Sequence, residues 1–294
     1  MQKGIIISNI SDLYKVESNN IIYDCNARGK FKTNEISPVA GDYVEIEITD
    51  EIKKVGVINK IEDRKNYLKR PKMANLSQII LVLSMKLPKP DLLLLDKQLV
   101  YAEYLGIKPI ICLNKIDLEN ENKIDAIYQL YSRIGYTVIK TNAKESIGVS
   151  PIKEYLKNNI TAFSGNSGVG KSTLINALIG ENIAEEGLIS NKNKRGKNTT
   201  TAIKLYEIDE DTYIADTPGF STFDISEIGS KELYHYFKEF GQFEENCEFI
   251  GCTHIKEENC GIKKAVENGE IDKARYERFC KIYQELKEKE ERKW

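Results

Sequence analysis

The chain has 294 residues, of which 41% are hydrophobic and 30% are charged, and its formal net charge is −2 at pH 7. It has no apolar run of the roughly eighteen residues that a membrane span needs, and its near-neutral charge excludes a uniformly basic nucleic-acid-binding protein. The first residues do not form a secretory signal, so we expect a cytoplasmic protein in which clustered cysteines bind metal rather than form disulfides.

Residues 1–71 consist of short runs rich in β-branched residues, separated by turn-forming residues. The runs are GIIISNI, NIIYDC, DYVEIEI and KVGVINKI. This pattern predicts a small closed barrel of the OB type. Such barrels often bind single-stranded nucleic acid or structured RNA, although a barrel that only docks on another protein fits the same pattern.

Two segments are locally basic. Residues 53–72 contain eight Lys or Arg and two acidic residues, and residues 192–204 contain five Lys or Arg and no acidic residue. A phosphate-rich partner could bind at either segment. The alternative is that both are ordinary solvated loops.

Residues 72–225 show the pattern of an α/β domain with a parallel sheet. Apolar strand candidates alternate with helical stretches such as residues 91–106, which end at a glycine. The strand candidates lie at residues 79–85, 109–113, 136–141, 160–165 and 212–217.

A phosphate-binding loop follows the fourth of these strands and opens a helix. Its residues are Gly165, Asn166, Ser167, Gly168, Val169, Gly170, Lys171 and Ser172, with Thr173 next. The glycines let backbone N–H groups surround phosphate oxygens, and the lysine neutralises the β and γ charges. The hydroxyl of Ser172 is the expected Mg²⁺ ligand.

A guanine-reading motif follows the second strand. Asn114, Lys115 and Asp117 belong to the sequence NKID at the carboxyl end of the expected sheet. The Asp117 carboxylate can accept hydrogen bonds from the ring N–H and the exocyclic amine of guanine, which adenine cannot supply on that edge. Together with the phosphate loop, the motif predicts GTP rather than ATP as the ligand.

Further nucleotide contacts are expected at the ends of other strands. Asn142 and Ala143 can place a backbone N–H on the guanine oxygen. Asp216 can hold Mg²⁺ through water, and the N–H of Gly219 can contact the γ-phosphate. Thr199, Thr200 and Thr201 lie in the loop before this switch, and Thr200 or Thr201 is expected to complete the Mg²⁺ shell.

The order of these motifs is unusual. In common GTPases the phosphate loop comes first, whereas here residues 114–117 precede residues 165–172. A circularly permuted domain can still assemble the same site, since the termini of a domain often lie close together.

Residues 226–294 are polar and helical in pattern, and they contain a cluster of soft metal ligands. Cys247, Cys252, His254 and Cys260 offer three thiolates and one imidazole within fourteen residues. Four such ligands fit one closed, structural zinc site.

With these five motifs the chain resembles the ribosome small subunit-dependent GTPase family RsgA, also called YjeQ. The resemblance rests on NKID at 114–117, GNSGVGKST at 165–173, RGKNTTT at 195–201, DTPGF at 216–220 and the four zinc ligands. It implies a bacterial cytoplasmic factor that acts late in maturation of the small ribosomal subunit. Such a factor binds rRNA through its barrel and zinc domain and hydrolyses GTP faster on the subunit.

The sequence departs from this family where histidine usually precedes the switch threonines, because Asn198 stands there. Phe220 stands where many GTPases place a water-orienting glutamine, so no catalytic group is identified and slow hydrolysis by the isolated chain is expected. We expect a monomer that binds neither DNA nor membrane. Two other functions stay open: an RNA-binding assembly scaffold with GTP as a structural ligand, and a GTPase switch directed at another protein.

Overall fold

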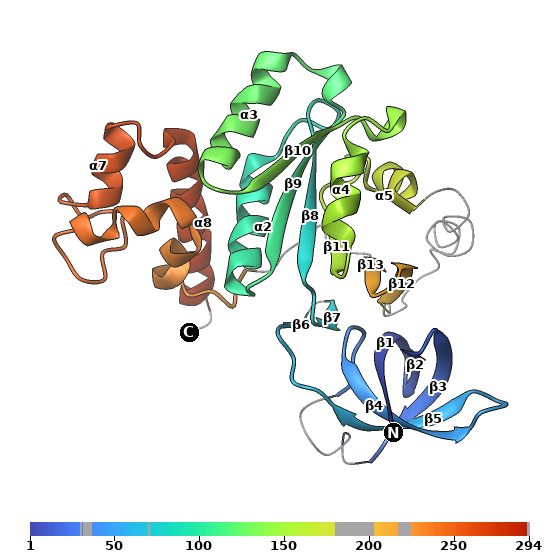
Figure 1. Ribbon diagram of the computed structural model, residues 1–294. Coiled ribbons are helices and arrows are strands. Elements are labelled where there is room, and N and C mark those ends of the chain that lie inside the picture. Colours follow the sequence, from blue (N-terminus) through green and yellow to red (C-terminus); the bar gives the residue numbers. More distant parts are fainter. Residues whose placement is uncertain (30, 32–36, 70, 180–202, 217–224, 293–294) are drawn as a thin grey trace. The chain divides into compact units, whose positions relative to one another are not determined.

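The computed structural model describes residues 1–29, 31, 37–69, 71–179, 203–216 and 225–292, and Figure 1 labels its helices and strands. The chain divides into two compact units. Unit 1 comprises Met1–Ile80, Ala143–Ser164 and Lys171–Phe220, and unit 2 comprises Leu81–Asn142, Gly165–Gly170 and Ser221–Trp294.

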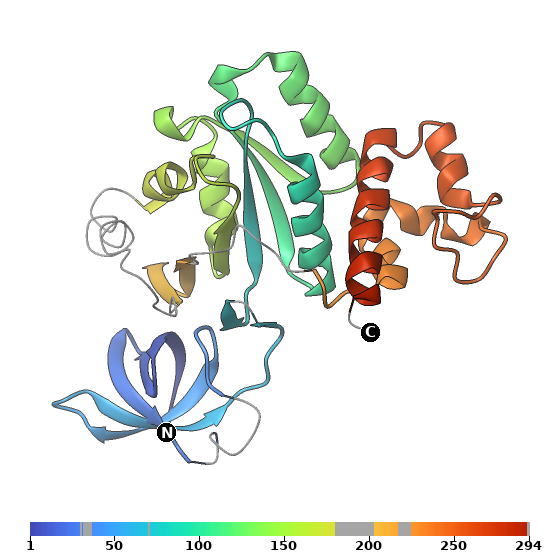
Figure 2. The ribbon, with the colours of Figure 1, turned by 180° about the vertical axis from the view of Figure 1, so that it is seen from behind.

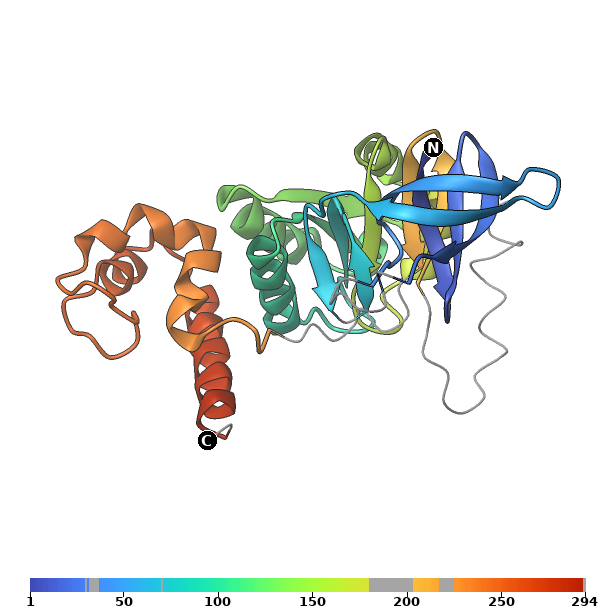
Figure 3. The ribbon, with the colours of Figure 1, turned by 90° about the horizontal axis from the view of Figure 1, so that it is seen from below.

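The first part of unit 1 is a closed five-stranded barrel. Its strands are β1 (Gln2–Ile10), β2 (Leu13–Ser18), β3 (Ile21–Ala27), β4 (Tyr43–Asp50) and β5 (Val55–Ile61). The strand order is β1-β2-β3-β5-β4, and β4 pairs back onto β1. Figure 3 shows β4 and β5 as a long hairpin. The prediction of a small closed barrel at the amino-terminal end is therefore confirmed.

Alternation along the strands fills the interior of the barrel. In β2, for example, Tyr14 and Val16 are buried, whereas Leu13 is exposed and Lys15 is half-buried. Side chains of successive strand residues point to opposite faces, so the β-branched and aromatic residues of one face form the core. That core consists of Ile6, Tyr14, Val16, Tyr23, Cys25, Val44, Ile46 and Ile58.

A buried ion pair ties the barrel to the segment that follows it. Asp42 is fully buried, and its carboxylate accepts hydrogen bonds from Arg64 Nε at 2.7 Å and Arg64 Nη2 at 2.8 Å. The backbone N–H of Val39 donates to the same carboxylate. A planar guanidinium that binds both oxygens fixes the orientation of each side chain. The short strands β6 (Tyr67–Lys69) and β7 (Lys72–Ala74) come next.

The rest of unit 1 is part of the α/β fold. β11 (Ile160–Ser164) runs parallel to β13 (Thr212–Asp216), and β12 (Lys204–Asp209) is antiparallel to β13. β12 also pairs with barrel strand β1 at Ser8 and Lys204. The helices of this part are α4 (Val149–Leu156) and α5 (Lys171–Ile179).

Unit 2 contains the other strands and helices of the α/β fold. β8 (Gln78–Ser84) begins in unit 1 and ends in unit 2, where β9 (Lys108–Asn114) and β10 (Thr137–Thr141) run parallel to each other. All seven residues of β8 are buried, as expected for a strand inside a parallel sheet. The helices are α2 (Leu92–Tyr104) and α3 (Glu121–Arg133), with the 3₁₀ turns η1 (Ile116–Leu118) and η2 (Ala143–Glu145), of which η2 belongs to unit 1.

The carboxyl-terminal part of unit 2 is mostly helical, as predicted. It comprises η5 (Ser230–Tyr236), η6 (Lys238–Gln242), η7 (Glu244–Asn246), α7 (Gly261–Glu267) and α8 (Lys273–Glu291). Its apolar core contains Phe237, Phe240 and Phe279 and also takes in Val100 and Tyr101 of α2. Figure 2 shows α8 beside α2. No helix in the described part of the chain is long and apolar enough to cross a membrane.

Candidate nucleotide and metal sites

The phosphate loop leaves β11 at Ser164 and opens α5 at Lys171, as predicted from its sequence. Two of its glycines have no room for a side chain. A Cβ atom at Gly165 would lie 2.2 Å from the Val82 carbonyl oxygen, and one at Gly170 would lie 2.3 Å from Asn114 Nδ2. Both residues also have positive φ, so the loop conformation requires glycine at these two positions.

Asn114 and Lys115 hold this loop from the end of β9. Asn114 is 2% exposed, and its Nδ2 donates to the Val169 carbonyl oxygen at 2.9 Å, while Thr141 Oγ1 donates to its Oδ1 at 3.1 Å. Lys115 Nζ donates to the carbonyl oxygens of Gly168 at 2.7 Å and of Leu87. The first two residues of the guanine-reading motif therefore contact the phosphate loop directly.

Asp117 lies in η1, and its side chain is exposed. The carboxyl ends of β9 and β10 lie side by side, because Asn114 is paired with Thr141 in their parallel register. Asp117 and Asn142 therefore both follow this one edge of the sheet. Asn142 is the last residue of its segment of unit 2 and is 3% exposed. Ala143, which belongs to unit 1, is 4% exposed. A planar ring could reach the Asp117 carboxylate from solvent.

The first turn of α5 carries the three other predicted phosphate and magnesium contacts. Lys171 is half-buried, and this burial lowers its pKa. The side chains of Ser172 and Thr173 are exposed, and a bound anion would counter the loss of hydration at the lysine. These three residues belong to unit 1, whereas Gly165–Gly170 belongs to unit 2.

The predicted switch residues are only in part within the described residues. Asp216 is the last residue of β13, where the sheet ends. Thr199, Thr200, Thr201 and Gly219 lie outside the described residues, as do Asn198 and Phe220.

The four predicted metal ligands come together in unit 2. The ligand atoms of Cys247, Cys252, His254 and Cys260 all lie within 4.8 Å of one another. His254 Nδ1 is 3.3 Å from Cys260 Sγ and 3.6 Å from Cys247 Sγ. His254 Nε2 is buried and has no hydrogen-bond partner within the described part of the chain. Three thiols and an imidazole at these separations could hold a metal ion.

Burial shifts the pKa of three of these four ligands. Burial raises the pKa of Cys252 to about 12 and also raises that of Cys260, whereas burial lowers the pKa of His254. The imidazole is therefore neutral and ready to act as a ligand, while a metal ion must displace the thiol protons.

Comparison with known proteins identifies the family. The sequence-family model of the RsgA GTPase matches residues 61–226, and the family model of the RsgA N-terminal domain matches residues 3–58. A relative from Clostridium novyi (strain NT), named small ribosomal subunit biogenesis GTPase RsgA, is 42% identical over 99% of this chain and 100% of its own length. The chain belongs to the RsgA GTPase family.

Two solved RsgA-type structures share this fold over almost the whole chain. YjeQ from Thermotoga maritima has a TM-score of 0.84 and 39% identity, covering 97% of this chain and 98% of its own. YloQ, described as a circularly permuted GTPase, has a TM-score of 0.81 and 33% identity, covering 98% and 96%. The predicted resemblance, the three-part fold class and the permuted order of the motifs are confirmed. Membership of the RsgA family also implies guanine nucleotide binding.

Sequence reasoning did not identify some residues that organise these sites. Asp91 precedes α2, where its Oδ1 accepts a hydrogen bond from the Leu94 N–H at 3.0 Å, and its Oδ2 lies 3.5 Å from Asn166 Nδ2. An aspartate just before an apolar helix is a typical N-cap, so this signal was present in the sequence. Glu257, which holds the turn around His254, has no comparable signal, because its partners are backbone N–H groups and the Thr253 hydroxyl of its own loop.

Proposed function

We propose that this chain is a GTPase that hydrolyses GTP to GDP and phosphate and acts in late maturation of the small ribosomal subunit. The observation that carries the proposal is the direct contact of Asn114 and Lys115 with the phosphate loop, since it joins guanine reading to phosphate binding. Membership of a GTPase family and the shared names of its curated relatives support the reaction and its ribosomal setting.

Each nucleotide contact is assigned to a residue of the site. Asp117 reads the guanine edge, Asn142 and Ala143 lie near its oxygen, and Lys171 neutralises the phosphates. Asn114, Lys115 and residues 165–170 shape the loop whose N–H groups bind phosphate oxygens. Ser172, Thr200 or Thr201, and Asp216 through water, would hold Mg²⁺, which neutralises charge on the β- and γ-phosphates. Thr173 completes the first turn of α5.

The Cys247, Cys252, His254 and Cys260 cluster is proposed to hold one zinc ion. Three buried or half-buried thiols with an imidazole suit zinc, and four protein ligands leave no open coordination position. The ion would therefore stabilise the carboxyl-terminal domain and take no part in hydrolysis.

Small-subunit rRNA is the proposed partner, contacted by the barrel and the zinc domain. Within the basic segment 53–72, Lys54, Lys65 and Lys72 are exposed and available to phosphates. Arg64 forms an ion pair with Asp42, and Lys60 lies 3.4 Å from Glu45, so these two cations already have acidic partners within unit 1. Most of segment 192–204 lies outside the described residues.

The remaining assignments follow from this role. The proposed domains are the barrel at 1–71, the permuted GTPase domain at 72–225 and the zinc-binding helical domain at 226–294. We propose a monomer that works in the cytoplasm, where ribosomes mature, and that uses neither DNA nor membrane. GTP and Mg²⁺ order the switch around Thr199–Thr201 and Asp216 and favour the subunit-binding arrangement, and hydrolysis releases the protein.

GTP turnover with and without purified small subunits tests the proposal, with large subunits as the control. We expect slow hydrolysis alone and strong stimulation by small subunits only. Tight GTP binding without stimulation would instead favour an RNA-binding scaffold, or a switch directed at another protein.

A further inference from the structure

Helix α2 begins at the nucleotide site. Its N-cap Asp91 lies against Asn166 of the phosphate loop, with 3.5 Å between Asp91 Oδ2 and Asn166 Nδ2. The segment just before the helix is bound to the guanine-reading motif, because the Met85 N–H donates to the Asn114 carbonyl oxygen and Lys115 Nζ donates to that of Leu87. The amino-terminal end of α2 is thus fixed to both nucleotide motifs.

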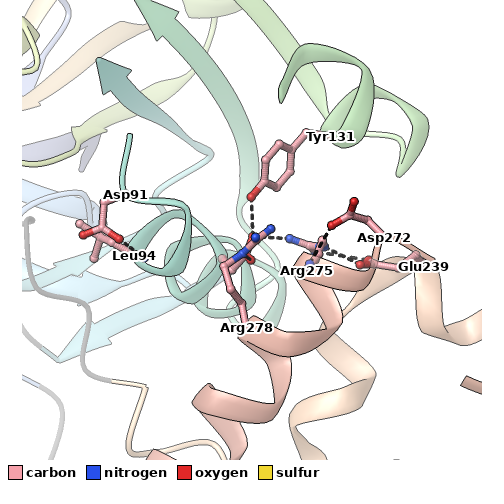
Figure 4. Close-up of polar contacts among 8 residues, drawn as sticks. Asp91, Leu94, Tyr131, Glu239, Asp272, Arg275 and Arg278 are labelled. Atoms are coloured by element: carbon pink, nitrogen blue, oxygen red, sulfur yellow. Dashed lines mark hydrogen bonds and ion pairs between the residues drawn. The ribbon is translucent and has the colours of Figure 1, made fainter. Parts of the chain in front are cut away.

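The middle of α2 is bound to the carboxyl-terminal domain through the buried carboxylate of Asp96. Figure 4 labels Tyr131, Glu239, Arg275 and Arg278, which surround it. Asp96 is fully buried and accepts hydrogen bonds from Tyr131 Oη at 2.7 Å, from Arg278 Nε at 2.5 Å and from Arg275 Nη1. Arg275 is 1% exposed, and Glu239 binds its other edge. We call these five residues the Asp96 cluster: Asp96, Tyr131, Glu239, Arg275 and Arg278.

The rest of α2 adds contacts to the same domain. Val100 and Tyr101 are buried in the core that contains Phe237 and Phe279. Lys97 pairs with Glu285 of α8 at 2.5 Å, and Glu103 pairs with Lys238 at 2.9 Å. One helix therefore lies in the core of the carboxyl-terminal domain while its N-cap residue Asp91 contacts the phosphate loop.

We infer that α2 transmits docking of the carboxyl-terminal domain on the small subunit to the phosphate loop, with Asp96 as its anchor in that domain and Asp91 as the residue that positions Asn166. The inference rests on the proposed subunit-stimulated hydrolysis and names how that stimulation reaches the site. Its ligand is the small subunit itself, bound by the domain that α8 belongs to.

The physical reason is that the N-cap and the middle of α2 cannot adjust independently. The Asp96 cluster pairs two guanidinium groups with two carboxylates whose side chains are at most 12% exposed, so a partial displacement would leave a poorly hydrated charge unpaired. A well-packed helix shifts as one body, and a displacement at Asp96 therefore reaches its N-cap. Coupling between two binding equilibria is reciprocal, so a docking event that changes how the phosphate loop binds nucleotide requires nucleotide binding to change the carboxyl-terminal domain.

The first test is a double-mutant cycle on turnover. Arg278→Gln removes one of the three donors to Asp96, and Asp91→Ser keeps an N-cap oxygen while it shortens the reach to Asn166. We expect Arg278→Gln to leave basal kcat and KM within about twofold of the parent and to lower stimulation by small subunits at least about fivefold. In the double variant, stimulation by small subunits should be no lower than in the single variant that is stimulated less. The losses of thermal stability, in contrast, should add. Lys281→Gln, which removes an exposed charge one turn along α8, should behave like the parent.

The second test needs no ribosomal particle. Amide hydrogen exchange of residues 273–286 is measured in the nucleotide-free protein and with GDP or a non-hydrolysable GTP analogue. The parent protein should show a nucleotide-dependent change in this segment, and Asp91→Ser and Arg278→Gln should abolish it. Unchanged exchange in the parent despite saturating nucleotide would overturn the inference. Normal stimulation of both single variants would also overturn it, as would a double variant whose fold-loss of stimulation is the product of the two single losses. If the parent is not stimulated at all, the proposed function fails and hydrogen exchange alone decides whether α2 couples the two sites.

Discussion

Glu17 of β2 and Glu207 of β12 share a hydrogen bond between their carboxyl groups, and this contact raises the pKa of Glu207 to about 7. Burial and the negative charges of Glu17 and Asp211 act in the same direction. The pair lines a cavity of about 320 Å³ in unit 1, whose other charged residues are Lys3, Glu62, Glu210 and Asp211. The barrel thus meets β12 through two acidic side chains, of which Glu207 has the raised pKa.

This pair predicts that unit 1 becomes less stable as the pH rises. The folded pKa of Glu207 is above its unfolded value of about 4.3, so the stabilisation is complete below that value and is lost as the pH rises through about 7. Glu207→Gln supplies a permanent amide donor to Glu17. It should raise the free energy of unfolding at pH 8 by about 1 kcal/mol after solvent screening and change little at pH 4.

Calorimetric melting of the parent and the Glu207→Gln variant at the two pH values checks this prediction. Glu210→Gln is the matched control, because Glu210 is exposed at the adjoining turn and lines the same cavity. An equal effect of Glu207→Gln at both pH values would show that the pair does not hold a proton.

Replacing Asp117 by asparagine should change the preferred base. The carboxylate accepts two hydrogen bonds from guanine, and an amide presents a donor where one acceptor was needed. We expect GTP affinity to fall by about 10²- to 10³-fold and xanthosine triphosphate to bind better than GTP. Competition binding of the two nucleotides measures this, with Asp125→Asn on α3 as the control. Unchanged guanine selectivity would remove Asp117 from base recognition.

Gly170→Ala should strongly weaken nucleotide binding without unfolding the chain. The new methyl group would lie 2.3 Å from Asn114 Nδ2 at a residue with φ of +99°, so the loop must shift away from the end of β9. We expect at least about a hundredfold weaker binding of GDP and GTP, since correct placement of the phosphate donors depends on this loop. Gly241→Ala is the control, because nothing lies within 4 Å of a Cβ atom there. Titration with a fluorescent GDP would contradict the prediction if both variants bound alike.

Glu257 should control how tightly the metal is held. Burial alone would raise its pKa, but hydrogen bonds from its own N–H, from the Thr253 hydroxyl and from the N–H groups of Thr253 and Ile255 lower it to about 2. This carboxylate therefore fixes the turn that presents His254. Glu257→Gln should weaken zinc retention by about 10- to 100-fold, as expected for loss of a residue that orients a ligand.

Competition with a chromogenic chelator and measurement of bound zinc check the role of Glu257. The neighbouring Glu258→Gln variant, which alters an exposed carboxylate, should retain zinc like the parent. Equal zinc retention by the parent and both variants would show that the Glu257 carboxylate is not needed to hold the turn around His254.

The sequence predicted those parts of the site that depend on contiguous residues. The phosphate loop and the guanine-reading motif are predictions of this kind, because each needs a few adjacent residues after a strand, and the strands expected at 136–141 and 212–217 appear as β10 and β13. The metal cluster could be predicted in the same way, since its four ligands lie within fourteen residues.

Contacts between distant segments could not be predicted in this way. Asp96 and Arg275 are 179 positions apart, and neither residue stands in a recognisable pattern. The stretch KELYHYFKEF, expected to be helical, forms the 3₁₀ elements η5 and η6. Tyr234, Phe237 and Phe240 recur every third residue, which is the period of a 3₁₀ helix, and tertiary packing of these aromatic rings selects it.

The position of Val100 and Tyr101 in the carboxyl-terminal core limits how this protein can be divided. A fragment expressed from residue 226 onward would retain the metal ligands, but it would expose the apolar face that α2 covers and leave Arg275 without the Asp96 carboxylate. Such a fragment should aggregate or bind its metal without a fixed fold. A chimera that transplants the metal-binding segment must therefore carry α2 with it.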